Sequence, residues 1–183
     1  ECLSLAGAVH RASRGRFDPT IQPLWMCYAE ASAQGVLPTA GLLDSVQTHT
    51  GWERVNIDSS SIVMQEGMSL TLNGIAQGYI ADRVAAMLTA EGLTDILIDT
   101  GEFHAIGTHP DGHAWPIKLA AGGNVALAER ALATSAPLGT TFDQNAQVGH
   151  ILDPRCGRAV QSIWQEITIS AKSAALADAL STA

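Results

Sequence analysis

The chain has 183 residues, of which 46% are hydrophobic and 15% are charged, so its composition is that of a folded globular protein and not of a disordered segment. Ten Lys and Arg against eighteen Asp and Glu give a net charge of -8, which argues against a nucleic-acid-binding surface. The apolar runs fall far below the roughly 18 residues of a membrane span, and three scattered cysteines without a CxxC pair indicate neither a disulfide framework nor a zinc site.

The first part of the chain predicts helices and loops followed by short strands. Residues 3–13 fit the end of a helix, and residues 16–25 ("RFDPTIQPLW") predict a proline-punctuated loop. A second helix is predicted to begin after Thr39 as its N-cap and to close at Gly51. Residues 52–72 then predict short strands joined by polar turns.

The stretch "TLNGIAQGYIADRVAAML", residues 71–88, predicts a helix with an unusual start. From Ile80 onward the apolar residues fall at helical spacing, so this face is expected to pack on a core. Gly74 and Gly78 each weaken a helix by roughly 1 kcal/mol relative to alanine, a cost tolerated where backbone must approach something closely. An anion bound at the helix start would require such an approach, and a tight strand-to-helix turn is the plainer explanation.

The second half predicts mostly strands. They are expected at residues 95–101, on both sides of the His-Pro-Asp-Gly turn at 109–112, and at 130–136, 149–154 and 164–170, before a closing helix at 173–183. Because strands outnumber helices and most connections are short, the predicted fold class is α+β, with a mixed, largely antiparallel sheet and flanking helices.

The closing helix carries the first candidate site. Asp178, Ser181 and Thr182 stand at positions i, i+3 and i+4, so they share one helix face among alanines and leucines. Three oxygens on one face suit a hard cation such as Mg²⁺, which takes one or two carboxylates and completes its shell with water and substrate phosphates. The alternative interpretation is a solvated polar stripe on an amphipathic helix.

A second candidate lies in "GHILDPRCGRAV". Asp153-Pro154 followed by Gly157 predicts a turn in which Asp153 accepts backbone amides and Gly157 is left-handed, and Asp18 in "RFDPT" has the same turn explanation. His150 precedes this turn and could act as a general base or contact a phosphate. A dinucleotide-binding loop is excluded at "DTGEFHAIG", which contains no GxGxxG.

Four segments together resemble one family, the ApbE-type FAD:protein FMN transferases. They are "GRFDPTIQPLW", "LTLNGIAQGYIADRVAAMLTAEGLTDILIDTG", "GHILDPRCGRAV" and "SAALADALSTA", in the family's order and approximate spacing. The resemblance implies a single ApbE-like domain over residues 1–183, shortened at its N-terminus, and Mg²⁺-dependent transfer of FMN from FAD to a threonine of a target flavoprotein, with release of AMP.

The resemblance also implies roles for individual residues, and it places the protein in the periplasm, with membrane attachment only through an N-terminal anchor. His150 would assist the transfer, and the metal ligands would be Gly74, Asp178, Ser181 and Thr182. Flavin contacts would come from Arg16, Phe17, Asp18, Thr71, Gln77 and Ile151.

Three positions depart from the family pattern. Thr71 stands where the family usually has Asp, Gln77 replaces a charged residue, and Glu102 replaces the second glycine of a Gly-Gly pair. Glu102 resembles the NosX-type branch, associated with nitrous oxide reductase maturation. Two alternatives to flavin transfer therefore stay open: an FAD pyrophosphatase that releases FMN and AMP, and a non-catalytic module that binds flavin or a partner.

Overall fold

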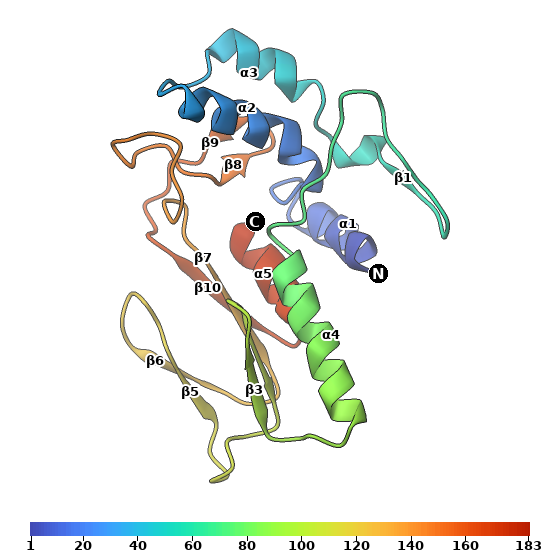
Figure 1. The fold of residues 1–183 in the computed structure, drawn as a ribbon, viewed down its shortest axis with the longest axis vertical. Coiled ribbons are helices and arrows are strands. Elements are labelled where there is room, and N and C mark those ends of the chain that lie inside the picture. Colours follow the sequence, from blue (N-terminus) through green and yellow to red (C-terminus); the bar gives the residue numbers. More distant parts are fainter. The chain divides into compact units, whose positions relative to one another are not determined.

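The computed structural model describes all 183 residues, which form two compact units. Unit 1 comprises Glu1–Leu5, Asn73–Ala136 and Gln165–Ala183, and unit 2 comprises Ala6–Leu72 and Pro137–Trp164. Both units combine helices with antiparallel strand pairs, which confirms the predicted α+β class (Figure 1). No helix is both long enough and apolar enough to cross a lipid bilayer.

Unit 1 is built on a four-stranded sheet in the order β10-β7-β4-β3, with a separate β5–β6 hairpin. Its elements are α4 (Ala76–Ala90), β3 (Ile96–Asp99), β4 (Phe103–Ile106), β5 (Trp115–Lys118), β6 (Asn124–Leu127), β7 (Ala131–Ser135), β10 (Ile167–Ala171) and α5 (Ala174–Thr182). Helix α1 (Cys2–Ala12) has residues in both units.

The two faces of the unit 1 sheet have different partners because successive strand residues point to opposite sides. Ala131 of β7 packs in a cluster with Ala81 of α4 and Ala174 of α5. Leu132, the next residue of β7, packs instead with Ile117 and Leu127 of the β5–β6 hairpin. Helices α4 and α5 therefore cover one face of the sheet, and the hairpin covers the other.

Unit 2 packs two helices around an aromatic cluster. Its elements are η1 (Pro19–Ile21), α2 (Gln22–Ala33), α3 (Ala40–Gln47), η2 (Trp52–Arg54), β1 (Asn56–Ile57), β2 (Ile62–Val63), β8 (Leu152–Asp153) and β9 (Arg158–Ala159), where η marks a 3-10 helix. The rings of Tyr28 and Phe142 stack with centroids 5.1 Å apart, and Leu24 and Leu43 are buried in the same cluster. Helix α2 is thus a core element of this unit.

Some sequence predictions are wrong in ways that have a physical cause. The predicted loop over residues 16–25 is wrong from Gln22 onward, because α2 begins there with Pro23 in its first turn. A proline is tolerated at that position since the first N–H groups of a helix have no intrahelical acceptor. The helix after Thr39 is confirmed with its cap, whose Oγ1 accepts the Leu42 amide at 3.3 Å, although it ends at Gln47.

The strands predicted on both sides of the turn at 109–112 exist as β4 and β5, but they belong to different sheets. Strand β4 pairs with β3 and β7, and β5 pairs with β6. The intervening loop therefore connects the two layers of unit 1 and does not close a hairpin. Short segments such as β6 and β9 had too little alternation to be predicted.

Asp82 of α4 holds the start of α5. Its carboxylate accepts hydrogen bonds from the Ser173 hydroxyl at 2.7 Å, from the Ala174 and Ala175 amides at 2.7 and 3.0 Å, and from the His104 ring at 2.7 Å. Burial alone would raise the pKa of Asp82, but these hydrogen bonds outweigh it and hold the pKa below 3.8. One carboxylate thus fixes the N-terminus of α5 against α4 and β4.

We expect Asp82→Ala to lower the free energy of unfolding by about 2–3 kcal/mol at pH 7, because several partly buried donors lose their acceptor. Since the folded-state pKa is depressed, the contribution is present above the unfolded pKa and is lost as pH falls below 3.8. Urea unfolding of both proteins at pH 7 and near pH 3 measures this. Glu91→Ala, at an exposed carboxylate just after α4, is the control and should change stability by less than about 0.5 kcal/mol. Equal losses in the two variants would contradict the assigned role.

Candidate active site

Asp178 lies in the interior of unit 1, against the start of α4. Its side chain is only 5% exposed, and its Oδ2 accepts the backbone N–H of Gly78 at 3.3 Å. The first amides of a helix carry partial positive charge and favour a carboxylate. Burial raises the pKa of Asp178 to about 6, while the Gly78 hydrogen bond opposes the shift. Asp178 is therefore a buried, partly satisfied carboxylate and not part of a solvated stripe.

The packing of α5 against α4 explains Gly78, one of the two glycines at the start of α4. A Cβ at this position would lie 2.3 Å from the carbonyl oxygen of Ala174, which is a backbone atom of α5. Helices α4 and α5 can pack this closely only because Gly78 has no side chain. The close approach inferred from the sequence is thus confirmed at Gly78 with a neighbouring helix as the partner. Gly74 lies two residues before α4 begins.

The hydroxyls of Ser181 and Thr182, which the sequence places beside Asp178, contact a third hydroxyl, that of Ser135. Ser135, the last residue of β7, lies with its Oγ 2.7 Å from Ser181 Oγ and 3.2 Å from Thr182 Oγ1. Ser181 is 5% exposed and also donates to the Asp178 carbonyl at 2.9 Å. These hydroxyls form a connected group along the face of α5 that carries Asp178, and Ser181 is already engaged with protein partners.

Gln77 is hydrogen-bonded to the turn between β3 and β4, and Glu102 is part of that turn. The Gln77 amide donates to the Thr100 carbonyl at 3.0 Å, so the start of α4 is tied to this turn. Glu102 is 8% exposed, and its Oε2 is buried without a hydrogen-bond partner. Burial and the nearby charge of Asp178 raise the pKa of Glu102 to about 7. A hydrogen bond from the Thr134 backbone acts in the opposite direction and lowers this pKa. The sequence marked Glu102 only as a departure from a family pattern.

In unit 2, the loop of Arg16, Phe17 and Asp18 is held by hydrogen bonds to neighbouring residues. Asp18 Oδ1 accepts both the amide and the hydroxyl of Thr20, at 2.8 and 2.6 Å, and Oδ2 accepts the Trp52 amide at 3.2 Å. Asp18 is thus the N-cap of η1, which confirms the turn explanation. Phe17 is buried at 5% exposure, whereas Arg16 is exposed.

The remaining unit 2 residues predicted to act on flavin lie on two segments. The Thr71 amide donates to the Pro19 carbonyl at 2.8 Å, which places Thr71 beside the Asp18 turn. The Ile151 carbonyl accepts the Val160 amide at 3.0 Å, so its backbone is part of the hairpin that contains β8 and β9. His150 Nδ1 lies 3.1 Å from the Thr140 carbonyl. Nδ1 then carries the proton in the neutral ring and Nε2 carries the lone pair, the arrangement that a general base needs.

The Asp153 turn is confirmed in detail. Its carboxylate accepts the Arg155 amide at 2.9 Å, its carbonyl accepts the Gly157 amide at 2.8 Å, and Gly157 has a φ of +66°. Two guanidinium contacts from Arg155 help to hold the pKa of Asp153 below 3.8, against the effect of burial. Asp153 therefore shapes the backbone after His150.

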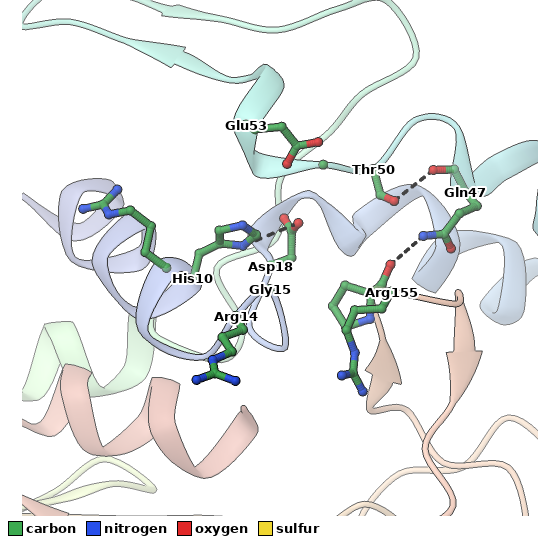
Figure 2. A pocket seen from close by; sticks show the side chains of 11 residues that line it. His10, Arg14, Gly15, Asp18, Gln47, Thr50, Glu53 and Arg155 are labelled. Carbon is green, nitrogen blue, oxygen red and sulfur yellow. Dashed lines mark hydrogen bonds and ion pairs between the residues drawn. The ribbon is translucent and has the colours of Figure 1, made fainter.

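An open pocket of about 480 Å³ lies in unit 2 and is shown in Figure 2. Asp18 is the only predicted site residue in its lining, where it stands with His10, Gln47 and Thr50. The lining also includes Arg11, Arg14, Arg155 and Glu53. The pocket is therefore polar, with cationic groups in excess.

The sequence profile of the ApbE family matches residues 1–183. The chain belongs to the ApbE family. It is 28% identical over 185 residues to the FAD:protein FMN transferase of Chlamydia muridarum, a match that covers 95% of this chain and 58% of that protein.

Solved structures agree with this assignment. The fold matches apo ApbE flavinyl transferase from Pseudomonas stutzeri with a TM-score of 0.87 and 30% identity, over 99% of this chain and 59% of that one. It matches the ApbE protein of Thermotoga maritima with a TM-score of 0.85 and 27% identity, over 98% of this chain and 62% of that one. This ApbE-family chain thus spans about three fifths of the length of the relatives it matches.

Unit 1 of this ApbE-family protein contains oxygen donors of the kind that a magnesium ion takes. No group of three or more His, Cys, Asp and Glu side chains converges anywhere in the chain. Mg²⁺ needs only one or two carboxylates with neutral oxygens and water, and the buried Asp178, the unpartnered Glu102 oxygen and the Thr182 hydroxyl supply oxygens of this kind. The donor set therefore fits the metal that the family resemblance implies.

Sequence reasoning did not show that Glu102 is buried near the charge of Asp178, or that Ser135 contacts Ser181 and Thr182. Glu102 directly precedes β4, and Ser135 is the last residue of β7. At the ends of a strand, the alternation of apolar and polar residues says little about which side chains are buried. The signal available for Glu102 was its place directly after the glycine of "DTGEF", in a turn that follows an apolar strand. Ser135 gave no signal beyond its position at the end of a predicted strand.

Proposed function

We propose that the protein transfers FMN from FAD to a threonine hydroxyl of a target flavoprotein in a Mg²⁺-dependent reaction. The relatives are named FAD:protein FMN transferases, and the chain spans about three fifths of their length. The observation that carries the metal part of the proposal is Asp178, which is buried against the first turn of α4 with a single long hydrogen bond. A carboxylate in that position needs a cation for full compensation.

The proposed step is a displacement at phosphorus. The acceptor hydroxyl forms a P–O bond to the phosphate of the FMN half, the pyrophosphate P–O bond to the AMP half breaks, and AMP leaves. His150 Nε2 would take the hydroxyl proton, since Nδ1 is turned toward the Thr140 carbonyl. Mg²⁺ held by Asp178 and Thr182, with Gly74 and Ser181 in support, would supply charge neutralisation on the phosphates.

The same proposal assigns flavin contacts to the Arg16–Asp18 loop, Thr71, Gln77 and Ile151, and a periplasmic location to the protein. The hydrogen bonds of Asp18 support a positioning role for its carboxylate, with the loop backbone and Arg16 left to meet a ligand. Gln77 would contribute to flavin binding indirectly, by holding the β3–β4 turn in place through its hydrogen bond to the Thr100 carbonyl. The location is proposed from the family resemblance alone.

Incubation with FAD, Mg²⁺ and an acceptor domain carrying a flavinylation threonine tests the function. We expect the acceptor mass to rise by one FMN, with one AMP released for each adduct, and we expect no adduct with EDTA or with an acceptor whose threonine is changed to alanine. Free FMN and AMP formed without an acceptor would identify a pyrophosphatase instead. Intact FAD with no adduct would leave the binding-module alternative.

A further inference from the structure

The turn that carries Glu102 is fixed to the same helix end as Asp178. Gln77, the second residue of α4, donates to the Thr100 carbonyl at 3.0 Å, and Gly78, the third, donates to Asp178 at 3.3 Å. Within the turn, the Thr100 amide donates to the Glu102 carbonyl at 3.2 Å. The backbone that bears Glu102 is therefore set in place by the first turn of α4.

The carboxyl group of Glu102 is buried and only partly compensated, by a hydrogen bond from the Thr134 backbone. It is 8% exposed, its Oε2 has no hydrogen-bond partner, and no cation is among the charges that act on it. The charges that do act on it come from Asp178 and Asp99, and both disfavour its ionised form. A buried carboxylate oxygen with no donor costs free energy, and a bound cation is one way to offset that cost.

We propose that Glu102 is a second carboxylate ligand of the divalent cation, in addition to Asp178. The inference rests on the proposed function for the presence of that cation, and it adds a ligand from the β3–β4 turn to those of α5. Two carboxylates with neutral oxygens and water satisfy Mg²⁺ and Mn²⁺. The cation would satisfy Oε2 of Glu102 and cancel the repulsion between the two acids.

The test compares Mn²⁺ affinity of the wild type, Glu102→Gln and Asp99→Asn by isothermal titration calorimetry. We expect Glu102→Gln to weaken Mn²⁺ binding about tenfold or more, because a ligand carboxylate is lost while the shape of the side chain is kept. Asp99→Asn is the matched control: it removes an exposed carboxylate three residues away that also acts on Glu102 through its charge. The control should change the affinity less than about threefold. Equal affinity in Glu102→Gln and wild type, or an equal loss in both variants, would overturn the proposal.

A second measurement needs no variant. Mn²⁺ located by its anomalous scattering in crystals of the wild-type protein should have a Glu102 oxygen in its coordination shell. Mn²⁺ bound at Asp178 with the Glu102 carboxyl turned away would overturn the inference while leaving the proposed metal dependence intact. FMN transfer that fails despite Mn²⁺ binding through Glu102 would instead refute the proposed function alone.

Discussion

Replacing Asp178 by asparagine is expected to weaken Mg²⁺ and Mn²⁺ binding by about tenfold or more and to slow metal-dependent FMN transfer by about two orders of magnitude. The carboxylate is the central buried acid of the proposed metal site, and loss of metal charge stabilisation of a few kcal/mol gives a factor of this size. Asparagine keeps the shape and can still accept the Gly78 amide, so the fold should be retained. Calorimetric titration and the rate of adduct formation measure the two effects.

The same variant should be at least as stable as the wild type when no metal is present. Burial raises the pKa of Asp178 to about 6 from 3.8, so the folded state binds the proton more tightly than the unfolded state. The wild type is therefore penalised as pH rises from about 4 to about 6, and the full penalty remains above that window. Metal-free urea unfolding at pH 4 and pH 7 should show the advantage of Asp178→Asn only at the higher pH.

A metal affinity unchanged by Asp178→Asn would contradict the site itself. A variant that fails to fold would show that the negative charge of Asp178 stabilises α4. That result would contradict the prediction that the charge lowers the stability of the metal-free protein at pH 7. Asp111→Asn, at an exposed carboxylate of unit 1, is the control and should leave both metal affinity and the transfer rate unchanged.

Gly78→Ala is expected to lower the free energy of unfolding by about 3 kcal/mol or more. Its Cβ would lie 2.3 Å from the Ala174 carbonyl oxygen and 2.4 Å from the Ala174 carbonyl carbon, and relief would require a shift of α5 as a whole. Because α5 carries Asp178, the displacement should also reduce the affinity for Mn²⁺. Thermal or urea unfolding and a metal titration measure the two consequences.

Gly41→Ala provides the matched control for this prediction. Gly41 lies within α3, has an ordinary helical φ, and has no heavy atom within 4 Å of the point that a Cβ would occupy. The same substitution should stabilise the protein there by up to about 1 kcal/mol, because alanine is the better helix former. Similar stabilities of Gly78→Ala and wild type would show that α4 and α5 do not pack as closely as the structure has them.

The sequence determined the elements whose signals are local. Thr39 as an N-cap and the left-handed Gly157 after Asp153 each depend on a few neighbouring residues, and both are confirmed. The apolar spacing from Ile80 predicted the helix α4 but not its buried face, because Ile80 and Met87 are 54% and 66% exposed whereas Ala81 and Ala85 are buried. The set of four motifs also sufficed to identify the family, because their order and spacing are properties of the chain alone. Helix α2 was missed since Pro23 is read as a helix breaker, although a proline in the first turn breaks no hydrogen bond.

Only the tertiary structure decided which polar groups are buried and what they meet. Asp178 and Glu102 are 76 positions apart in sequence numbering, and neither helical spacing nor strand alternation could show that burial couples their charges. The reason for Gly78 was equally non-local, since the atom that excludes a side chain belongs to Ala174 of another helix. Burial and close approach depend on how α4, α5 and the β3–β4 turn pack together, so the sequence could name candidate oxygens but not select those that lack a partner.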